Sequence, residues 1–388
     1  MTTKLGLRFI VIMALLGIFA LPAFAQDDAE VVSEPLTETY GPMTITTVAP
    51  WDVAVGQAGV IGIATFDLVE ASESGDFPID GIVGQLRLVG IPRINLEDAE
   101  VNAVNIMGGL LLAQGADPEN LPEITEFSLD NYDFARVDVS QDGDATAFVY
   151  TVVFTDTTFG IFTAASTAGL LDREDEMLAV LDTATFEFDA PIPEGATERY
   201  QQYTIGVSEA GFPRLGDPDA PVTVIEIGSF DCPHCGTFHE TVLPTILERV
   251  VEGEVRFVYI PVYGTGSYAN GDNAARASLC VGEENFWAYH DALYTWQTEY
   301  FNYAFLYERL LNAAVSLGVD ADEFNECYAS DMTSEILRAA FSATQELVPE
   351  NFGTPTVLVN NVRIDVSVPT IHDAIDAALA DNEEATGE

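Results

Sequence analysis

Two cysteines in the second half of the chain have the spacing of a redox-active pair. Cys232 and Cys235 enclose Pro233 and His234. A thiol exchanges with a disulfide only as its thiolate, and the amides at the start of a helix stabilise the thiolate of the first cysteine in such a motif. His234 adds positive charge nearby when it is protonated. The pattern predicts thiol–disulfide exchange, with the pKa of Cys232 well below its free value.

The elements around this motif support the prediction. A β-branched run at 221–228 indicates a buried strand, and residues 238–250 predict a helix. The motif therefore lies between the end of a strand and the start of a helix, which is the context expected of a redox pair. A stabilised thiolate favours the reduced form, so the disulfide form is expected to be an oxidant.

Two other uses of these side chains are open. A zinc ion could be held by Cys232, His234, Cys235 and His239, although a structural zinc site normally takes its ligands from two separated pairs and no second pair follows. The two cysteines could also form a purely structural disulfide. We favour the redox interpretation and expect neither a metal nor a cofactor.

The remaining elements of this region follow a recognisable order. After the helix come a strand at 255–262, a long helical stretch at about 270–347, a hairpin at 356–364 and a last helix at about 368–380. Strand, helix, strand, helical insertion, hairpin and helix is the order of a thioredoxin fold with an inserted helical bundle. The fold class expected is therefore α/β.

Several segments around the motif resemble the DsbA family of thiol:disulfide oxidoreductases. Besides the motif, the likeness lies in residues 215–224, 275–277, 286–293 and 353–356. The resemblance implies that Cys232 is the exposed, attacking sulfur and that Cys235 is the buried one. It also implies that Thr354 and Pro355 form a cis-proline loop facing the disulfide, with an ordinary trans-proline turn as the alternative.

Glu226, six residues before Cys232, matches the acid that this family keeps buried beneath its redox pair. The resemblance implies that Glu226 relays a proton to or from Cys235, whereas a carboxylate facing solvent from a strand end is the alternative. We interpret the remaining histidines as packed side chains without a catalytic role: His239, His290 and His372.

Two further cysteines lie in the helical stretch. If Cys232 and Cys235 are the redox pair, Cys280 and Cys327 are left to each other. Closing the long loop between them would stabilise the fold by roughly 4 kcal/mol in the chain-entropy model. We expect a structural disulfide here, with two buried free thiols as the alternative.

The N-terminus has the form of a secretory signal. Lys4 and Arg8 precede an apolar run at 9–21, and residues 23–25 have the small-x-small pattern of a cleavage site. We expect residues 1–25 to be removed and the protein to work outside the cytoplasm, in the periplasm or at the cell exterior. An uncleaved membrane anchor is the alternative.

The charge balance excludes one class of partner. The chain carries 14 Lys and Arg against 63 Asp and Glu, a formal net charge of −49. Nucleic acids bind through Lys and Arg and the release of counterions, so a nucleic acid is not expected as a partner. The acids are scattered along the chain, which is typical of a solubilising surface and not of a single acidic binding site.

A chain of 388 residues predicts two domains. After the signal, the predicted parts are a flexible lead-in (26–43), a mixed α+β domain (44–190), a linker (191–216), the thioredoxin-fold domain (217–381) and an acidic tail (382–388).

The α+β domain has its own pattern of elements. Strands are predicted at 134–139 and 147–154 around an Asp142-Gly143 turn, followed by a strand at 159–165 and a helix at 172–183. This order resembles the second half of a PsbP-like domain. The domain contains neither His nor Cys, so a Ser-His-Asp triad is impossible and a binding or scaffolding role is expected.

These observations favour an oxidase that donates a disulfide to reduced secreted proteins. The resemblance implies a membrane partner that reoxidises it. A reductase or isomerase with the same motif is the alternative within this chemistry. From another class, the chain could be a binding protein whose N-terminal domain captures partners.

Overall fold

The structure is a computed structural model that describes residues 35–47, 50–55, 61–68, 70–71, 81–90, 101–140, 146–155, 157–166, 173–350 and 352–386. The chain consists of two compact units, Met1–Glu187 and Phe188–Glu388. The expected signal segment and the Asp142-Gly143 turn lie outside the described residues.

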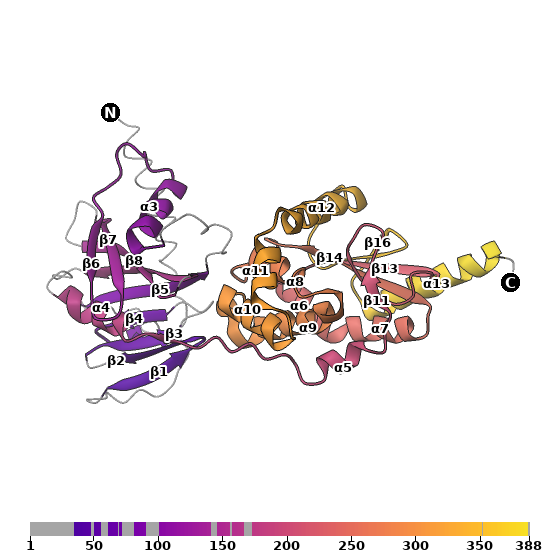
Figure 1. Cartoon of the computed structure of the whole chain (residues 1–388), viewed down its shortest axis with the longest axis horizontal. Helices are drawn as coiled ribbons and strands as arrows, with labels where there is room; N and C mark the ends of the chain where they lie inside the picture. Colours follow the sequence, from indigo (N-terminus) through magenta and orange to yellow (C-terminus); the bar gives the residue numbers. More distant parts are fainter. Residues whose placement is uncertain are drawn as a thin grey trace. The chain divides into compact units, whose positions relative to one another are not determined.

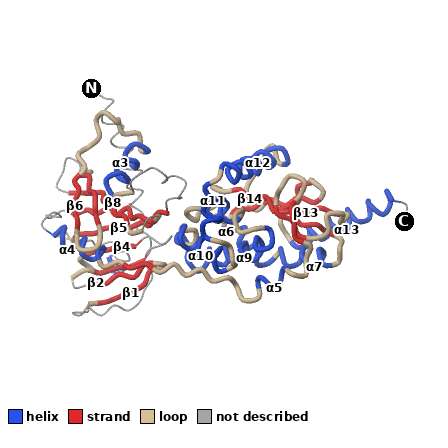
Figure 2. The backbone as a smooth tube through the Cα atoms, viewed as in Figure 1, coloured by secondary structure: helices blue, strands red, loops and turns tan. Residues whose placement is uncertain are grey.

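The first unit contains a seven-stranded antiparallel sheet (Figure 2). In spatial order its strands are β3 (Asp52–Val55), β4 (Ile61–Ala64), β5 (Ile82–Gly90), β9 (Thr158–Ser166), β8 (Thr146–Val153), β7 (Asp133–Asp138) and β6 (Thr125–Ser128). Residues of β5 alternate between buried and more exposed positions, as in a sheet with one face on a core.

Among the described residues of this unit, helices α3 and α4 and a small sheet accompany the large sheet. Helix α3 (Ala103–Ala113) buries Met107 and Leu111 against Val137 and Val149 of the large sheet. Helix α4 (Glu174–Asp182) precedes β10 (Thr185–Phe186), and β10 pairs with β2 (Met43–Thr47), which pairs with β1 (Leu36–Tyr40).

The described end of the predicted lead-in is therefore ordered. Residues 36–40 form β1 because Thr37 and Thr39 pair their hydroxyls with Thr46 and Thr44 of β2 across the hairpin. The prediction of a flexible segment was wrong for these residues. The PsbP-like resemblance of the first unit and its binding role stay predictions.

The second unit is built on a six-stranded mixed sheet (Figure 1). In spatial order the strands are β11 (Ile205–Val207), β12 (Pro213–Leu215), β14 (Val255–Val262), β13 (Val222–Ser229), β15 (Thr356–Val359) and β16 (Val362–Ile364). The central β13 runs parallel to β14 and antiparallel to β15. This arrangement is the thioredoxin topology that the sequence predicts.

Two helices connect β13 to β14, and their sequences explain their ends. Helix α6 (Pro233–Thr241) has proline at its first position, where no backbone donor is needed. Helix α7 (Leu243–Val251) buries Leu243, Ile246, Leu247 and Val250, whose spacing of three and four residues forms one apolar stripe.

A helical segment is inserted between β14 and β15. It consists of α8 (Gly271–Ser278), α9 (Glu283–Tyr300), η4 (Phe301–Tyr303), α10 (Tyr307–Ser316), α11 (Ala321–Ala329) and α12 (Asp331–Leu347). Its centre is α9, whose Trp287, Tyr289, His290 and Trp296 are fully buried. Side-chain caps start α11 at Asp320 and α12 at Ser330.

Residues 191–216, predicted as a linker, belong to the second unit instead. They form α5 (Ala196–Tyr200) and the strands β11 and β12 of its sheet. Buried Tyr200, Phe212 and Leu215 anchor the segment, so its polar composition misled the prediction.

The C-terminal tail also differs from the prediction. Helix α13 (Val368–Thr386) continues through most of residues 382–388 without a helix-stopping glycine or proline before Thr386. In the part of the chain that the structure describes, no helix is both long enough and apolar enough to span a bilayer.

Candidate active site

The cysteine motif lies at the junction of the central strand and the helix that follows it. Strand β13 ends at Ser229, and Cys232 is the N-cap residue of α6. The backbone N–H groups of Cys235 and Gly236 both donate to the carbonyl of Cys232, which closes the first turn. Cys232 therefore faces the positive end of the helix dipole, and Cys235 lies one turn inside the helix.

Each thiol has a defined neighbour. The Cys232 thiol donates to the backbone carbonyl of Thr354, with the sulfur 3.2 Å from the oxygen. The Ser229 N–H lies 3.5 Å from the sulfur of Cys235 and donates to it. The Thr354–Pro355 peptide is cis and leads directly into β15, which pairs with β13. The structure thus brings the cis-proline segment against the cysteine pair.

The two thiols differ strongly in acidity. The hydrogen bond from the Cys235 thiol is the largest cause that lowers the pKa of Cys232 to about 5, and burial opposes it. The Thr354 side chain and the backbone amides of Cys235 and His234 also lower this pKa. Burial raises the pKa of Cys235 far above that of a free thiol. Near neutral pH only Cys232 is a thiolate.

Glu226 lies beneath this pair on β13. Its side chain is buried, and its Oε1 atom has no hydrogen-bond partner. Burial raises the pKa of Glu226 well above its usual value, and the negative charge of Cys232 adds to the rise. Glu226 in turn helps to raise the pKa of Cys235. The structure therefore contradicts the alternative of a solvent-facing carboxylate.

Cys232 is more covered than the sequence led us to expect. The residue is only 3 % exposed, so the expectation of an exposed sulfur was wrong for this structure. The loop after β14 passes so close that a side chain at Gly266 would collide with the backbone of Asp231 and Cys232. The hydroxyls of Thr265 and Thr354 lie 2.6 Å apart, and this hydrogen bond ties the covering loop to the cis-proline segment.

Two buried side chains that sequence reasoning missed hold this arrangement. Asp231 accepts hydrogen bonds from the amides of Gly264 and Gly266 at 2.6 and 2.7 Å, which fixes the covering loop. Gln297 of α9 donates to the carbonyls of Phe230 and Cys232. The position of Asp231 directly before Cys232 could have indicated its role at the motif. Nothing in the sequence indicates that Gln297 contacts the motif.

The other residues of the motif are at the surface. Pro233 and His234 are exposed at the start of α6. The side chain of His239 lies close to His290 and Asp291 of α9 and not to the cysteine pair, so the described residues do not form the four-residue zinc site considered from the sequence. A cavity of about 820 Å³ runs along α6, with Pro233 and His239 in its lining.

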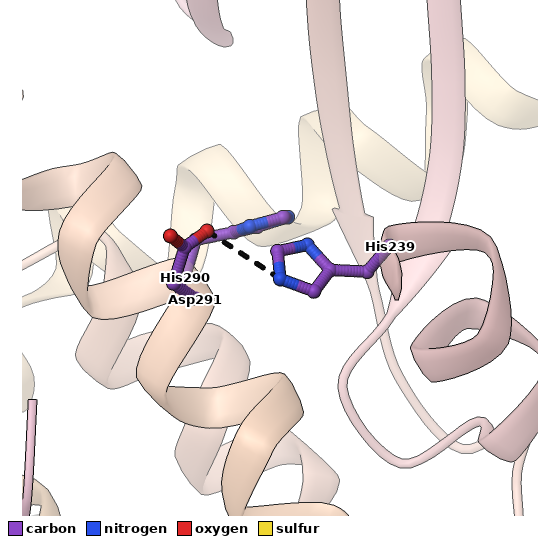
Figure 3. Close-up of side chains that lie close together, drawn as sticks. All are labelled: His239, His290 and Asp291. Atoms are coloured by element: carbon purple, nitrogen blue, oxygen red, sulfur yellow. Dashed lines mark ion pairs between the residues drawn. The ribbon is translucent and has the colours of Figure 1, made fainter. Parts of the chain in front are cut away.

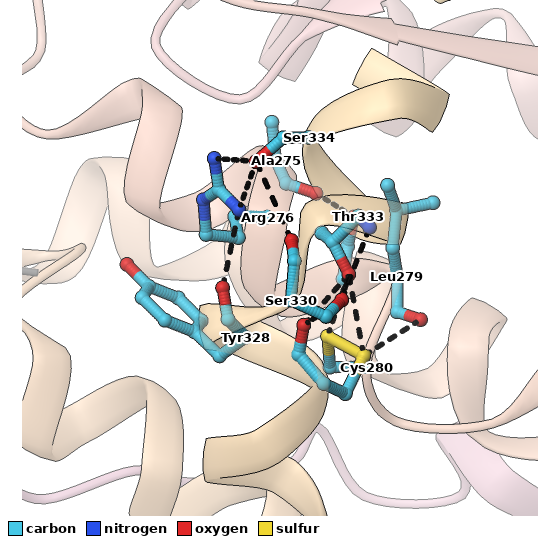
Figure 4. Close-up of a disulfide and its surroundings, with 10 residues drawn as sticks. Ala275, Arg276, Leu279, Cys280, Tyr328, Ser330, Thr333 and Ser334 are labelled. Carbon is cyan, nitrogen blue, oxygen red and sulfur yellow. Dashed lines mark hydrogen bonds between the residues drawn. A yellow bond between two sulfur atoms is a disulfide. The ribbon is translucent and has the colours of Figure 1, made fainter. Parts of the chain in front are cut away.

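Cys280 and Cys327 form a disulfide within the helical insertion (Figure 4). It joins the turn after α8 to α11, and its Cα atoms lie 5.6 Å apart. Thr333 at the start of α12 contacts both sulfurs through its hydroxyl. The bond therefore ties the turn after α8 to α11, and the Thr333 contact adds the start of α12.

The second unit is similar to known proteins in sequence. A family model described as Thioredoxin matches residues 209–377. A candidate disulfide bond formation protein D of Bacillus anthracis is 31% identical over 170 residues, which are 42% of this chain and 77% of that protein. A candidate protein-disulfide oxidoreductase of Rickettsia typhi is 28% identical over 170 residues, 43% of this chain and 62% of that protein. This chain thus spans less than two thirds of the Rickettsia relative.

Solved structures also resemble a part of the chain. BdbD from Bacillus subtilis has 24% sequence identity and a TM-score of 0.38, and the match covers 46% of this chain and 98% of that chain. Alpha-DsbA1 from Wolbachia pipientis has 22% identity and a TM-score of 0.39, and the match covers 48% of this chain and 100% of that chain.

Proposed function

Because this chain belongs to the DsbA-like family of thioredoxin-fold protein-disulfide oxidoreductases, we propose that it oxidises cysteine pairs in secreted proteins, outside the cytoplasm. One observation carries the proposal. The pKa of Cys232 is lowered to about 5 while the pKa of Cys235 is raised, so the reduced pair holds a stable thiolate at one sulfur only. A stable thiolate favours the reduced enzyme and makes its disulfide an oxidant.

The reaction follows from these two acidities. A substrate thiolate attacks the Cys232 sulfur of the Cys232–Cys235 disulfide, and Cys235 leaves. Because the Cys235 thiolate is strongly disfavoured, it takes up a proton, for which the buried Glu226, whose raised pKa favours its protonated form, is the neighbouring donor. The enzyme and substrate are then joined through Cys232.

The second step releases the product. Another substrate thiolate attacks the substrate sulfur of the mixed disulfide, and Cys232 leaves as the stabilised thiolate. The substrate has lost two electrons and gained a disulfide, and the enzyme has become a dithiol. An electron acceptor must then reoxidise the pair, and we propose a membrane-bound partner for this step, as the family resemblance implies.

Thr354 and Pro355 would position the substrate. The Thr354 carbonyl faces the Cys232 sulfur, so an extended substrate peptide that pairs with the backbone at this segment would bring its own sulfur to Cys232. Because Cys232 is only 3 % exposed and Thr265 is hydrogen-bonded to Thr354, the covering loop must move before a substrate peptide can pair with this segment.

The proposed location rests on two features. The Cys280–Cys327 disulfide is typical of an oxidising compartment. The charged and apolar residues of the first 25 positions have the pattern of a secretory signal.

The test is oxidation of a reduced two-cysteine peptide by the oxidised full chain. We expect stoichiometric peptide oxidation, its loss in Cys232→Ser, and a trapped mixed disulfide at Cys232 in Cys235→Ala. Wild-type protein that leaves the peptide reduced, or only reduces a disulfide peptide, would refute the oxidase.

A further inference from the structure

Three side chains of types that can bind a metal lie close together between α6 and α9: His239, His290 and Asp291. Figure 3 shows His239 reaching from one element toward His290 and Asp291 on another. His239 belongs to α6, and His290 and Asp291 are consecutive residues of α9. One donor atom from each of the three lies within 4.8 Å of the others.

His290 has no ordinary hydrogen-bond partner, although it is fully buried. Neither ring nitrogen is satisfied. The surrounding aromatic rings offer π faces, and the Tyr259 and Tyr294 hydroxyls are 2.9 Å apart and bond each other. A buried polar group without a partner costs about 1–3 kcal/mol, so such a group in a native protein points to a missing interaction.

His239 and Asp291 have the separation of two ligands on one ion. The Nε2 atom of His239 lies 3.4 Å from Oδ1 of Asp291. Two ligands about 2.0–2.1 Å from a tetrahedral zinc ion are about 3.4 Å apart. Nδ1 of His239 is buried and has no partner either.

The carboxylate is held in place by neighbours. The Tyr200 hydroxyl donates to Oδ1 of Asp291 at 2.7 Å, and Arg199 donates to Oδ2 at 2.9 Å. Such contacts orient a metal-binding carboxylate. Arg199 thus forms an ion pair with Oδ2, which leaves Oδ1 as the carboxylate oxygen that faces His239.

One member of the cluster, His239, borders a cavity. His239 lines the cavity of about 820 Å³ along α6, together with Tyr200 and Tyr294. A site with three protein ligands and one open position on a cavity is the usual arrangement for an accessible zinc ion.

We propose that His239, His290 and Asp291 form a binding site for a divalent transition-metal ion of the zinc class, with the fourth position open to the cavity. Two imidazoles and one carboxylate suit zinc and cobalt better than calcium or magnesium, which prefer all-oxygen sites. A bound ion joins α6, which carries the redox pair, to α9 of the helical insertion. His290 needs a side-chain shift on the order of 1 Å to complete the tetrahedron.

The experiment uses the oxidised full chain after removal of metal by a chelator. Oxidation pairs Cys232 with Cys235, so no thiolate can supply a ligand. Titration with Zn²⁺ by calorimetry and with Co²⁺ by visible absorption should show one equivalent, without the sulfur-to-cobalt charge-transfer bands of a thiolate site. Zn²⁺ should also raise the melting temperature, because it binds the folded state.

Three variants decide the assignment. His239→Asn and Asp291→Asn should each weaken binding about tenfold or more, whereas His372→Asn on α13 should leave it unchanged. If Asp291→Asn fails to fold, the binding measured for His239→Asn, at the cavity wall, decides the assignment. Its circular dichroism spectrum checks that this variant is folded. Absence of saturable binding, or binding that is unchanged in His239→Asn, overturns the proposal. Because the thiols are blocked, this result is independent of the oxidase proposal.

Discussion

The sulfur of Cys232 lies 3.2 Å from the backbone carbonyl oxygen of Thr354, 122 residues further along the chain. The contact exists because β13 and β15 are adjacent in the sheet, so the end of one strand meets the cis-proline segment before the other. The reactive thiol is therefore positioned by the strand order of the sheet as well as by its own helix.

The acidity of Cys232 should depend on Cys235. Because the Cys235 thiol is the largest cause of the lowered pKa of Cys232, Cys235→Ala should raise that pKa from about 5. The measurement is the rate of iodoacetamide alkylation against pH, with Thr237→Ala on the exposed face of α6 as the control. A wild-type midpoint near the free-thiol value of roughly 8.5 would contradict this acidity.

Buried Glu226 should make stability depend on pH. Its folded pKa is raised above the usual 4.5, so the wild-type protein loses stability as the pH rises from there toward the folded pKa. The Glu226→Gln variant should not show this loss. Its free energy of unfolding should therefore fall less than that of the wild type, by up to about 1.4 kcal/mol for each pH unit in that range.

Denaturant unfolding of the oxidised protein at several pH values measures this difference, since the paired thiols do not titrate. Glu240→Gln, at an exposed position of α6, is the matched control. If the free energy of unfolding depends on pH equally in wild type and Glu226→Gln, ionisation of Glu226 does not destabilise the folded protein, which would contradict the prediction.

The loop over Cys232 should limit access to its sulfur. Thr265→Val removes the hydrogen bond to Thr354, and a loss of about 1 kcal/mol corresponds to roughly fivefold more frequent opening. Alkylation at pH 8, where Cys232 is fully ionised, should accelerate by that factor. Thr298→Val, exposed on α9, should have no effect. An unchanged rate in Thr265→Val would mean that this hydrogen bond does not hold the cover.

The Cys280–Cys327 disulfide should act on stability and not on exchange. The bond closes a separation of 47 residues, so Cys280→Ser with Cys327→Ser should lower the free energy of unfolding by roughly 4 kcal/mol. Peptide oxidation at a temperature where the double variant is folded should be unchanged. A loss of oxidation in the folded double variant would assign this disulfide a redox role.

The thioredoxin topology could be predicted because each element has a strong local signal. The β-branched run of β13, the apolar stripe of α7 and the short hairpin of β15 and β16 each identify themselves. The cis-proline segment was found through family resemblance, and the Cys280–Cys327 pairing by elimination.

Other features depend on contacts between distant segments. The cover over Cys232 requires Gly266 and Thr265, and Gln297 reaches the motif from the middle of α9. No periodicity or spacing reports such contacts. Residues 191–216 were misread because β11 and β12 are only three residues long, too short for a periodic pattern, and lie in an otherwise polar stretch.

The reduction potential of the Cys232/Cys235 pair tests the oxidase most directly. It is measured by equilibrating the full chain with glutathione buffers, with Cys232→Ser as the control that has no pair to titrate. The stabilised Cys232 thiolate predicts an oxidising value, closer to roughly −120 mV, that of DsbA, than to roughly −270 mV, that of thioredoxin. A value at the thioredoxin end would contradict the oxidase and make the protein a reductase.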